Sequence, residues 1–184
     1  MPKRALPPSE ALYPVPVVLV SSGDKNGSNI ITIAWCGVVC SEPPLVSISI
    51  RPSRYSHEII SRTGDFVINI PDVPLIKKTD ICGVISGRQT DKFKACSFTA
   101  LKSSKISSPM IEECPVNIEC KVTKTMSLGT HDMFIAKVLA LHADERVMSD
   151  NGSIDYKKAA PFVYNRGEYW DLGNRIGRYG FSSK

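Results

Sequence analysis

The sequence lacks the patterns that mark membrane-spanning, secreted and common nucleotide-binding chains. No apolar run is long enough to cross a bilayer. Residues 1–8 lack the apolar segment of a signal peptide, so we predict an N-terminal tail and a cytoplasmic protein. No G-x-G-x-x-G follows a strand-like segment, and G-x-x-x-x-G-K-[ST] is missing. These gaps disfavour Rossmann and P-loop cofactor sites.

A strong charge bias and a metal-binding cysteine pattern are also missing. The net charge is +5, and the basic residues are scattered rather than forming a stripe with interleaved aromatics. This argues against nucleic-acid binding and favours a small anionic ligand. The six cysteines include no C-x-x-C, and the three histidines do not fall at zinc-site spacings. We therefore predict no metal, no disulfides and mostly buried thiols, while a redox role for Cys36 and Cys40 stays open.

Short β-like segments separated by turn residues dominate the chain, whose 184 residues fit one domain. Apolar or alternating runs predict strands near 17–22, 28–40, 45–51, 65–70, 116–122 and 132–142. Two short helices are predicted over 57–63, capped by Ser53 or Ser56, and over 72–83. Residues 86–93 predict a polar surface loop, and the region from Pro161 an irregular tail. The pattern is mainly β and favours an antiparallel barrel with short peripheral helices.

One stretch, residues 27–56, combines a strand, a turn and a helix start. In its second strand Val46, Ile48 and Ile50 point one way and Arg51 points the other. Residues 52–56, Pro-Ser-Arg-Tyr-Ser, then lead into the helix. Two arginines and two hydroxyls therefore gather at a helix N-terminus, which predicts a phosphate site. A surface salt bridge for Arg51 and a plain capping role for Ser56 are the alternatives.

Several motifs follow one another in an order that is typical of one family. They are Pro14-x-Pro16, Asn29-x-x-Thr32-x-x-Trp35, Glu42-Pro43-Pro44, Arg51-x-x-Arg54-Tyr55-Ser56, Thr63-Gly64-Asp65-Phe66, Ser86-Gly87, Asp91-Lys92-Phe93 and Gly129-x-His131-x-x-Phe134. From about residue 10 to residue 145 the chain resembles the flavin reductase-like family with its FMN-binding split barrel, particularly the flavoredoxin and ferric-reductase-like branch. The resemblance implies a six-stranded antiparallel Greek-key barrel, with residues 1–184 as a single domain and 146–184 as a C-terminal extension. It also implies a homodimer with FMN near the interface.

The resemblance implies a role for each motif. Residues 29–35 would lie along the isoalloxazine ring, residues 51–56 would bind the phosphate, and Lys92 would stabilise the negative charge of the reduced ring. His131 would face the flavin or the nicotinamide as the catalytic residue, although the family often has aspartate before it, where this chain has Thr130 and places Asp132 after it. The expected FMN ligands are Asn29, Ile31, Thr32, Ala34, Trp35, Arg51, Ser53, Arg54, Tyr55, Ser56 and Lys92.

Three functions fit these expectations. The first is an FMN-binding flavin oxidoreductase that passes electrons from NAD(P)H to a small acceptor or a partner protein. The second is a flavoredoxin-type electron carrier that does not use NAD(P)H. The third is a barrel that binds another ligand such as haem, for which only His57, His131 and His142 could supply imidazole. Under any of them, Tyr164, Tyr169 and Trp170 would let the C-terminal extension cover the cofactor or a dimer partner.

Overall fold

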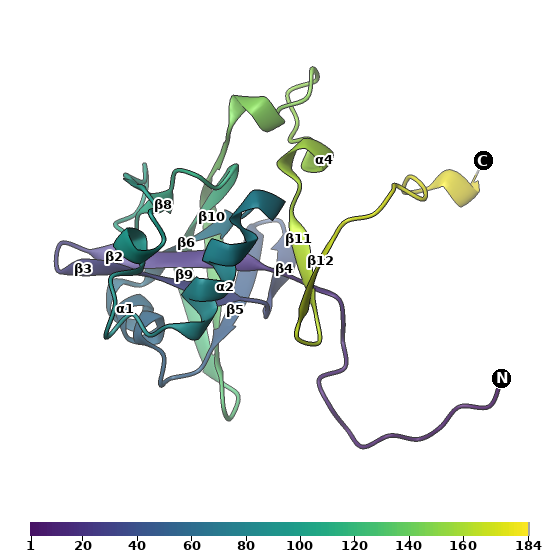
Figure 1. The fold of residues 1–184 in the computed structure, drawn as a ribbon, viewed down its shortest axis with the longest axis horizontal. Coiled ribbons are helices and arrows are strands. Elements are labelled where there is room, and N and C mark those ends of the chain that lie inside the picture. Colours follow the sequence, from purple (N-terminus) through teal and green to yellow (C-terminus); the bar gives the residue numbers. More distant parts are fainter. Residues whose placement is uncertain (184) are drawn as a thin grey trace.

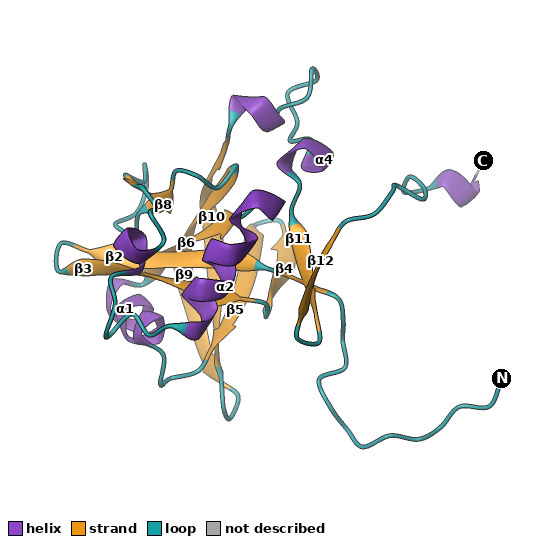
Figure 2. Cartoon of the chain, viewed as in Figure 1, coloured by secondary structure: helices purple, strands orange, loops and turns teal. Residues whose placement is uncertain are grey.

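A computed structural model describes residues 1–183 of the chain as a β-rich body with short helices on its surface (Figures 1 and 2). No helix among these residues has both the length and the apolar character needed to cross a membrane. The strands are β1 (Val15–Pro16), β2 (Val18–Asp24), β3 (Gly27–Ile33), β4 (Cys36–Ser41), β5 (Pro44–Ile50), β6 (Asp65–Ile70), β7 (Ala100–Leu101), β8 (Met110–Ile111), β9 (Val116–Ser127), β10 (Asp132–Ala143), β11 (Phe162–Asn165) and β12 (Glu168–Asp171). The α-helices are α1 (Tyr55–Thr63), α2 (Ile76–Val84), α3 (Lys92–Ala95) and α4 (Tyr156–Ala159), and 3₁₀ turns span Val73–Leu75, Glu145–Val147 and Phe181–Ser183.

The main sheet curls into a barrel. Its strand order is β3-β2-β6-β9-β10-β5-β4, and all neighbours are antiparallel. Strands β3 and β4 stand at opposite ends of this order, yet only residues 34–35 separate them in sequence. The two ends of the sheet must therefore meet, and the Ser49 backbone N–H donates to the Trp35 carbonyl at 2.9 Å where they do. The predicted mainly β barrel is confirmed.

The strand count differs from the predicted six, because the main sheet has seven strands. The sequence pattern runs almost unbroken from residue 28 to residue 40 and predicts one strand there. The chain in fact bends at Ala34 and Trp35, leaves β2 as its partner and pairs with β5 instead. Hydrophobic alternation reports which face a residue lies on but not which neighbour its strand pairs with.

Two strands are buried on both faces, which the alternation pattern does not predict. Inside the barrel, side chains such as Val20 and Phe66 form one apolar cluster. On the outer face of β2, Leu19 packs under α2 and α3 in a second cluster. In β6 the alternating side chains Phe66 and Ile68 are buried, but Ile70 is only half-buried and Asn69 on the opposite side is fully buried. Asn69 remains satisfied there because it donates to the Leu19 carbonyl and accepts from the Ile111 N–H.

The helix predicted after the phosphate-binding residues 51–56 is present, but the predicted capping by Ser53 or Ser56 is wrong. Helix α1 buries Ile59 and Ile60 and ends at Gly64, whose φ of 68° is left-handed. Its N-cap residue is Arg54, and no side chain caps it. Ser53 precedes the helix, and Ser56 lies within its first turn. The second predicted helix is α2, preceded by a 3₁₀ turn.

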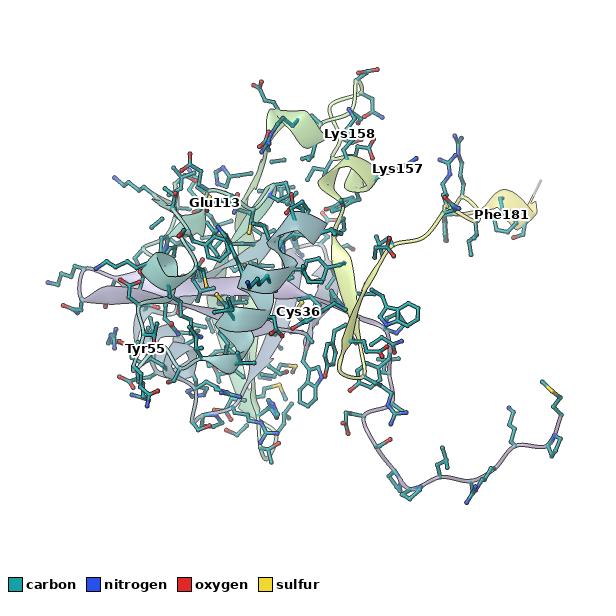
Figure 3. The ribbon with its side chains drawn as sticks, in the orientation of Figure 1. Cys36, Tyr55, Glu113, Lys157, Lys158 and Phe181 are labelled. Atoms are coloured by element: carbon teal, nitrogen blue, oxygen red, sulfur yellow. The ribbon has the colours of Figure 1, made fainter. Side chains whose placement is uncertain are left out.

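The loop predicted for residues 86–93 is partly wrong, because Lys92 and Phe93 begin helix α3 and are buried. The region from Pro161 is likewise more ordered than predicted: β11 and β12 form a hairpin that joins β1 in a three-stranded sheet. Beyond this hairpin the chain extends away from the body, as the N-terminal arm does on the same side (Figure 1). The side chain of Phe181 lies on this outer segment (Figure 3) and is 68% exposed.

All six cysteines are free thiols. Cys82, Cys96, Cys114 and Cys120 are buried, as predicted for most of them, and Cys36 and Cys40 are half-buried. Burial raises the pKa of the Cys36 thiol to about 11, so it is protonated and a poor nucleophile at neutral pH. This disfavours a reactive role for Cys36.

Candidate functional site

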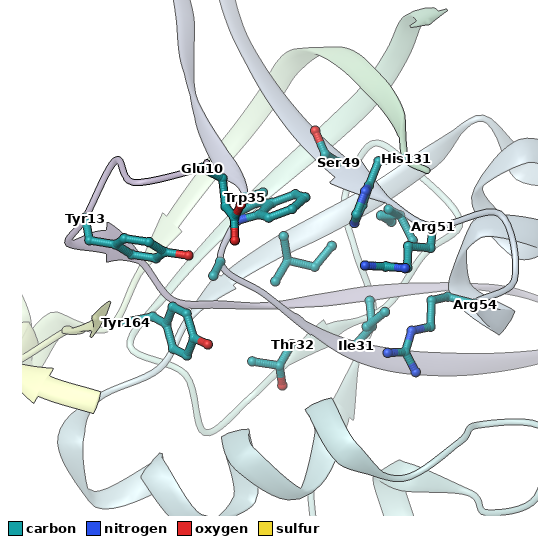
Figure 4. A pocket seen from close by; sticks show the side chains of 13 residues that line it. Glu10, Tyr13, Ile31, Thr32, Trp35, Ser49, Arg51, Arg54, His131 and Tyr164 are labelled. Carbon is teal, nitrogen blue, oxygen red and sulfur yellow. The ribbon is translucent and has the colours of Figure 1, made fainter. Parts of the chain in front are cut away.

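Two adjoining hollows lie where β3, β5 and the start of α1 meet. The larger has a volume of about 320 Å³ and the smaller about 90 Å³, and Ile31 and Arg54 line both. Figure 4 shows the larger hollow, with the arginines on one side and aromatic side chains on the other. All of the predicted site residues line one hollow or the other. The larger takes Ile31, Thr32, Ala34, Trp35, Arg51, Arg54 and His131, and the smaller takes Asn29, Ile31, Ser53, Arg54, Tyr55, Ser56 and Lys92.

Strand β3 offers its backbone to the larger hollow. It ends the strand order and pairs only with β2 within residues 1–183. Its other edge therefore carries peptide N–H and C=O groups that no strand there uses. Ile31 and Thr32 are half-buried along this edge, and the Trp35 side chain is 41% exposed at its end. Such an edge can exchange hydrogen bonds with the polar rim of a planar ligand.

Three cations converge on the hollows without an acidic partner. Among residues 1–183, the ion pairs do not include Arg51, Arg54 or Lys92. Lys92 is only 3% exposed, and its Nζ donates to the carbonyl of Cys82 at 2.7 Å. Burial lowers the pKa of Lys92, and the charge of Arg54 lowers it further. A buried ammonium held by one neutral acceptor is costly unless an anion joins it, so this end of the site favours an anionic ligand.

Asn29, Ser56 and Gly87 form the floor of the smaller hollow. Asn29 Nδ2 donates to Ser56 Oγ at 2.9 Å, and both side chains are buried. A Cβ at Gly87 would lie 2.1 Å from Asn29 Oδ1, so only glycine permits this approach. Ser56 does not cap the helix, because its Oγ accepts from Asn29 and no side chain caps α1. It holds Asn29 in place from inside the first turn.

His131 faces the larger hollow beside Trp35. The two ring centroids are 4.4 Å apart and the rings are tilted by 49°. Burial lowers the pKa of His131, and the nearby charge of Arg51 lowers it further. The imidazole is therefore neutral at pH 7. Its Nδ1 lies 3.0 Å from Thr130 Oγ1, which leaves Nε2 to face a ligand.

Replacing Arg51 with glutamine is expected to raise the pKa of His131 toward its ordinary value of 6.5, because the repelling charge is gone. The lowered pKa also sets how His131 affects stability, because the folded state disfavours the protonated ring. Above the pKa of the unfolded chain, His131 does not change the free energy of unfolding. As the pH falls below that pKa, the need to protonate the ring destabilises the fold. An NMR titration of the imidazole measures the change. Arg88→Gln, which removes an exposed arginine paired with Glu58, is the control. An unchanged titration curve in the Arg51 variant would show that burial alone lowers the pKa of His131.

Four residues outside 29–35 that line the larger hollow were not predicted as site residues: Glu10 and Tyr13 of the N-terminal arm, and Ser49 and Ile50 of β5. Tyr164 of β11, which was named among the aromatic residues that would let the extension cover the cofactor, lines the hollow too. Tyr13 and Tyr164 lie with ring centroids 6.0 Å apart, which explains how two distant segments reach one site (Figure 4). Of the other aromatic residues named for the extension, Tyr169 donates to Asp80 and Trp170 is 55% exposed. The pairing of β1 with β11, which the sequence does not reveal, brings Tyr13 beside Tyr164.

The three histidines are not part of a metal-binding cluster within residues 1–183. No group of three or more His, Cys, Asp or Glu side chains gathers there. His57 and His142 each bond to a carboxylate instead, at 2.8 Å to Asp132 and 2.7 Å to Glu119.

Comparisons with known proteins cover this same part of the chain. The model of the flavin reductase like domain matches residues 10–173, a range that includes every residue lining the two hollows. Flavoredoxin of Desulfovibrio vulgaris (Miyazaki F) matches the structure with a TM-score of 0.92 at 29% identity, covering 99% of this chain and 100% of that one. An FMN-binding domain of a flavin reductases-like enzyme from Shewanella baltica OS155 matches with a TM-score of 0.76 at 22% identity, covering 89% and 88%. An uncharacterized protein of Archaeoglobus fulgidus is 32% identical over 148 residues, which are 80% of this chain and 83% of that protein.

Proposed function

The chain belongs to the flavin reductase-like family, and we propose that it is an oxidoreductase that binds FMN in the two hollows and passes electrons from NAD(P)H to a small acceptor or a partner protein. The observation that carries the proposal is the cluster of Arg51, Arg54 and buried Lys92, which has no acidic partner among residues 1–183. A phosphate would supply the missing negative charge.

The residues present fit FMN as an elongated ligand with one anionic end. The smaller hollow, with Ser53, Arg54 and Lys92 around it, would hold the phosphate. The larger hollow, with the open edge of β3 and the aromatic ring of Trp35, would hold the isoalloxazine. The two hollows adjoin at Ile31 and Arg54, so one ligand can occupy both.

The protein's own residues would bind and orient, because bound FMN supplies the hydride acceptance and electron transfer. Backbone groups of β3 would fix the rim of the ring, and Trp35 would pack against it. His131, neutral at pH 7, can donate a hydrogen bond into the larger hollow without adding charge. No acid–base pair is required for hydride transfer, which fits a site that holds no carboxylate pair among its lining residues.

A second candidate is an electron carrier that holds FMN but does not react with NAD(P)H. The likeness to a flavoredoxin along nearly the whole chain favours it. Both functions need the same cofactor site, so the site does not separate them. They differ in the electron donor.

The experiment that tests the proposal begins with the visible absorbance of the purified, desalted protein and identification of any released chromophore. We expect FMN, either bound on purification or taken up when added. A protein that neither carries nor takes up FMN would contradict the cofactor assignment. Anaerobic addition of NADH or NADPH then decides between the candidates: bleaching supports the reductase, whereas reduction by a low-potential protein donor alone supports the carrier.

We also infer a homodimer, as expected for this family. Strand β4 ends the strand order and exposes Val38 at 80% and Val39 at 49%. An exposed apolar edge strand is a surface that pairing with another chain would cover. Sedimentation analysis of the purified protein measures the state directly, and a monomer at all concentrations would oppose the inference.

A further inference from the structure

A polar cluster joins helix α1 to the hairpin of β9 and β10, away from the lining of the hollows. His57 Nε2 donates to Asp132 Oδ2 at 2.8 Å, and Asp132 Oδ1 accepts from Ser127 Oγ at 2.7 Å. Only 16% of the His57 side chain and 14% of the Asp132 side chain are exposed. The ring of His57 also meets Phe134 edge-on at 5.2 Å between centroids. Each partner is therefore held by two contacts, which fixes the geometry between helix and hairpin.

The cluster lies next to His131 along the chain. Asp132 follows His131 directly and starts β10. The hairpin turn before it is closed by the Leu128 N–H, which donates to the His131 carbonyl at 3.0 Å. Fixing Asp132 therefore fixes the backbone from which the His131 side chain reaches Trp35.

The other end of the cluster lies next to the anion-binding end of the site. His57 follows Ser56, which receives the hydrogen bond from Asn29 in the floor of the smaller hollow. The backbone N–H of His57 also donates to the carbonyl of Arg54 at 3.0 Å. One helical turn thus carries residues of the smaller hollow on one side and His57 on the other.

We propose that His57 and Asp132 are a positioning pair that holds His131 against Trp35 and fixes its distance from the anion-binding end of the site. Neither residue lines the hollows, so both act through His131 rather than on a ligand. The consequence for electron transfer rests on the proposed function; the positioning itself does not.

The imidazole NMR signals of the apoprotein test the positioning. The chain has three histidines, so the spectrum contains three sets of ring signals, assigned by His131→Asn and His142→Gln. The Trp35 ring should displace the His131 signal by its ring current, and Trp35→Leu should abolish that displacement. His57→Phe keeps the ring packing on Phe134 but cannot donate a hydrogen bond to Asp132. In this variant the His131 signal should lose most of its ring-current displacement. Asp132→Asn, of equal size, should do the same.

Two further variants separate positioning from general loosening of the fold. His57→Gln places an amide donor near the former Nε2 and should restore the His131 signal. His142→Gln alters a histidine–carboxylate pair of similar length elsewhere in the protein and should leave that signal unchanged. Unchanged His131 signals in both His57→Phe and Asp132→Asn would overturn the proposal. The pair would then join helix α1 to the hairpin without positioning His131.

With FMN added, His57→Phe is expected to slow flavin reduction by NAD(P)H by up to about 100-fold, the loss that a misplacement of about 1 Å can cause. His57→Gln should recover most of the rate. If NAD(P)H reduces none of the proteins while the His131 signal still responds as described, the reductase function fails and the positioning pair stands. If reduction slows but the signal does not move, the positioning pair fails.

Discussion

Replacing Lys92 with methionine is expected to weaken FMN binding about 100-fold, or about 3 kcal/mol. Lys92 is 3% exposed and has one neutral hydrogen-bond acceptor. No ion pair among residues 1–183 includes it, so a phosphate beside it would supply the opposite charge that the protein does not. Methionine matches the four-atom apolar stem of lysine but lacks the charged amino group. The protein without ligand should be at least as stable as the wild type, because burying an unpaired ammonium costs free energy.

Riboflavin, which lacks the phosphate, decides where Lys92 acts. The resemblance places this lysine beside the ring, whereas the structure places it in the smaller hollow, with Asn29 and Ser56 and apart from Trp35 and His131. If Lys92 binds the phosphate, the variant should weaken FMN and leave riboflavin affinity nearly unchanged. Equal weakening of both ligands, with a shifted flavin reduction potential, would assign the lysine to the ring. Lys94→Met, in the same helix with its side chain 87% exposed, is the control.

The local motifs of the site could be predicted from sequence, because each one consists of distinctive residues at a regular spacing within one strand or one helical turn. The alternation of Val46, Ile48 and Ile50 places Arg51 on the opposite face of β5, and that arginine does line the larger hollow. Arg54 and Ser56 follow within one turn of helix. Short-range spacing is enough for such residues because strand and helix geometry fixes their directions.

The contacts between distant segments could not be predicted in this way. Tyr13 meets Tyr164 because β1 pairs with β11. Neither segment has a sequence pattern that indicates which strand it pairs with. The bend at Ala34 was hidden because β3 and β4 are both apolar in places and continuous in sequence. The same limit applies to His57 and Asp132, which are separated by 75 positions. A histidine on a short helix gives no sign of its partner.

Replacing Glu119 with glutamine is expected to destabilise the fold by about 3 kcal/mol and to lower the melting temperature by about 10 °C. Glu119 is fully buried in β9. Its carboxylate accepts hydrogen bonds from the N–H and Oγ of Ser104 at 2.8 Å each, from the Lys105 N–H at 2.7 Å and from His142 Nε2 at 2.7 Å. A carboxylate satisfies four donors, whereas the amide of glutamine presents its own N–H groups to some of them. Glu112→Gln, at an exposed position, should change stability little.

The pH dependence of stability gives an independent measure of the same carboxylate. Burial by itself would raise the pKa of Glu119, but the hydrogen bonds from Ser104, His142 and Lys105 lower it to about 2. Because the folded-state pKa lies below the ordinary value of 4.5, the stabilisation is complete above pH 4.5 and is lost as the pH falls toward 2. The wild type should therefore lose about 3 kcal/mol across this range through Glu119 alone. Denaturant unfolding of Glu119→Gln should show a correspondingly shallower acid loss, and parallel curves for the two proteins would mean that Glu119 does not retain its charge in the folded state.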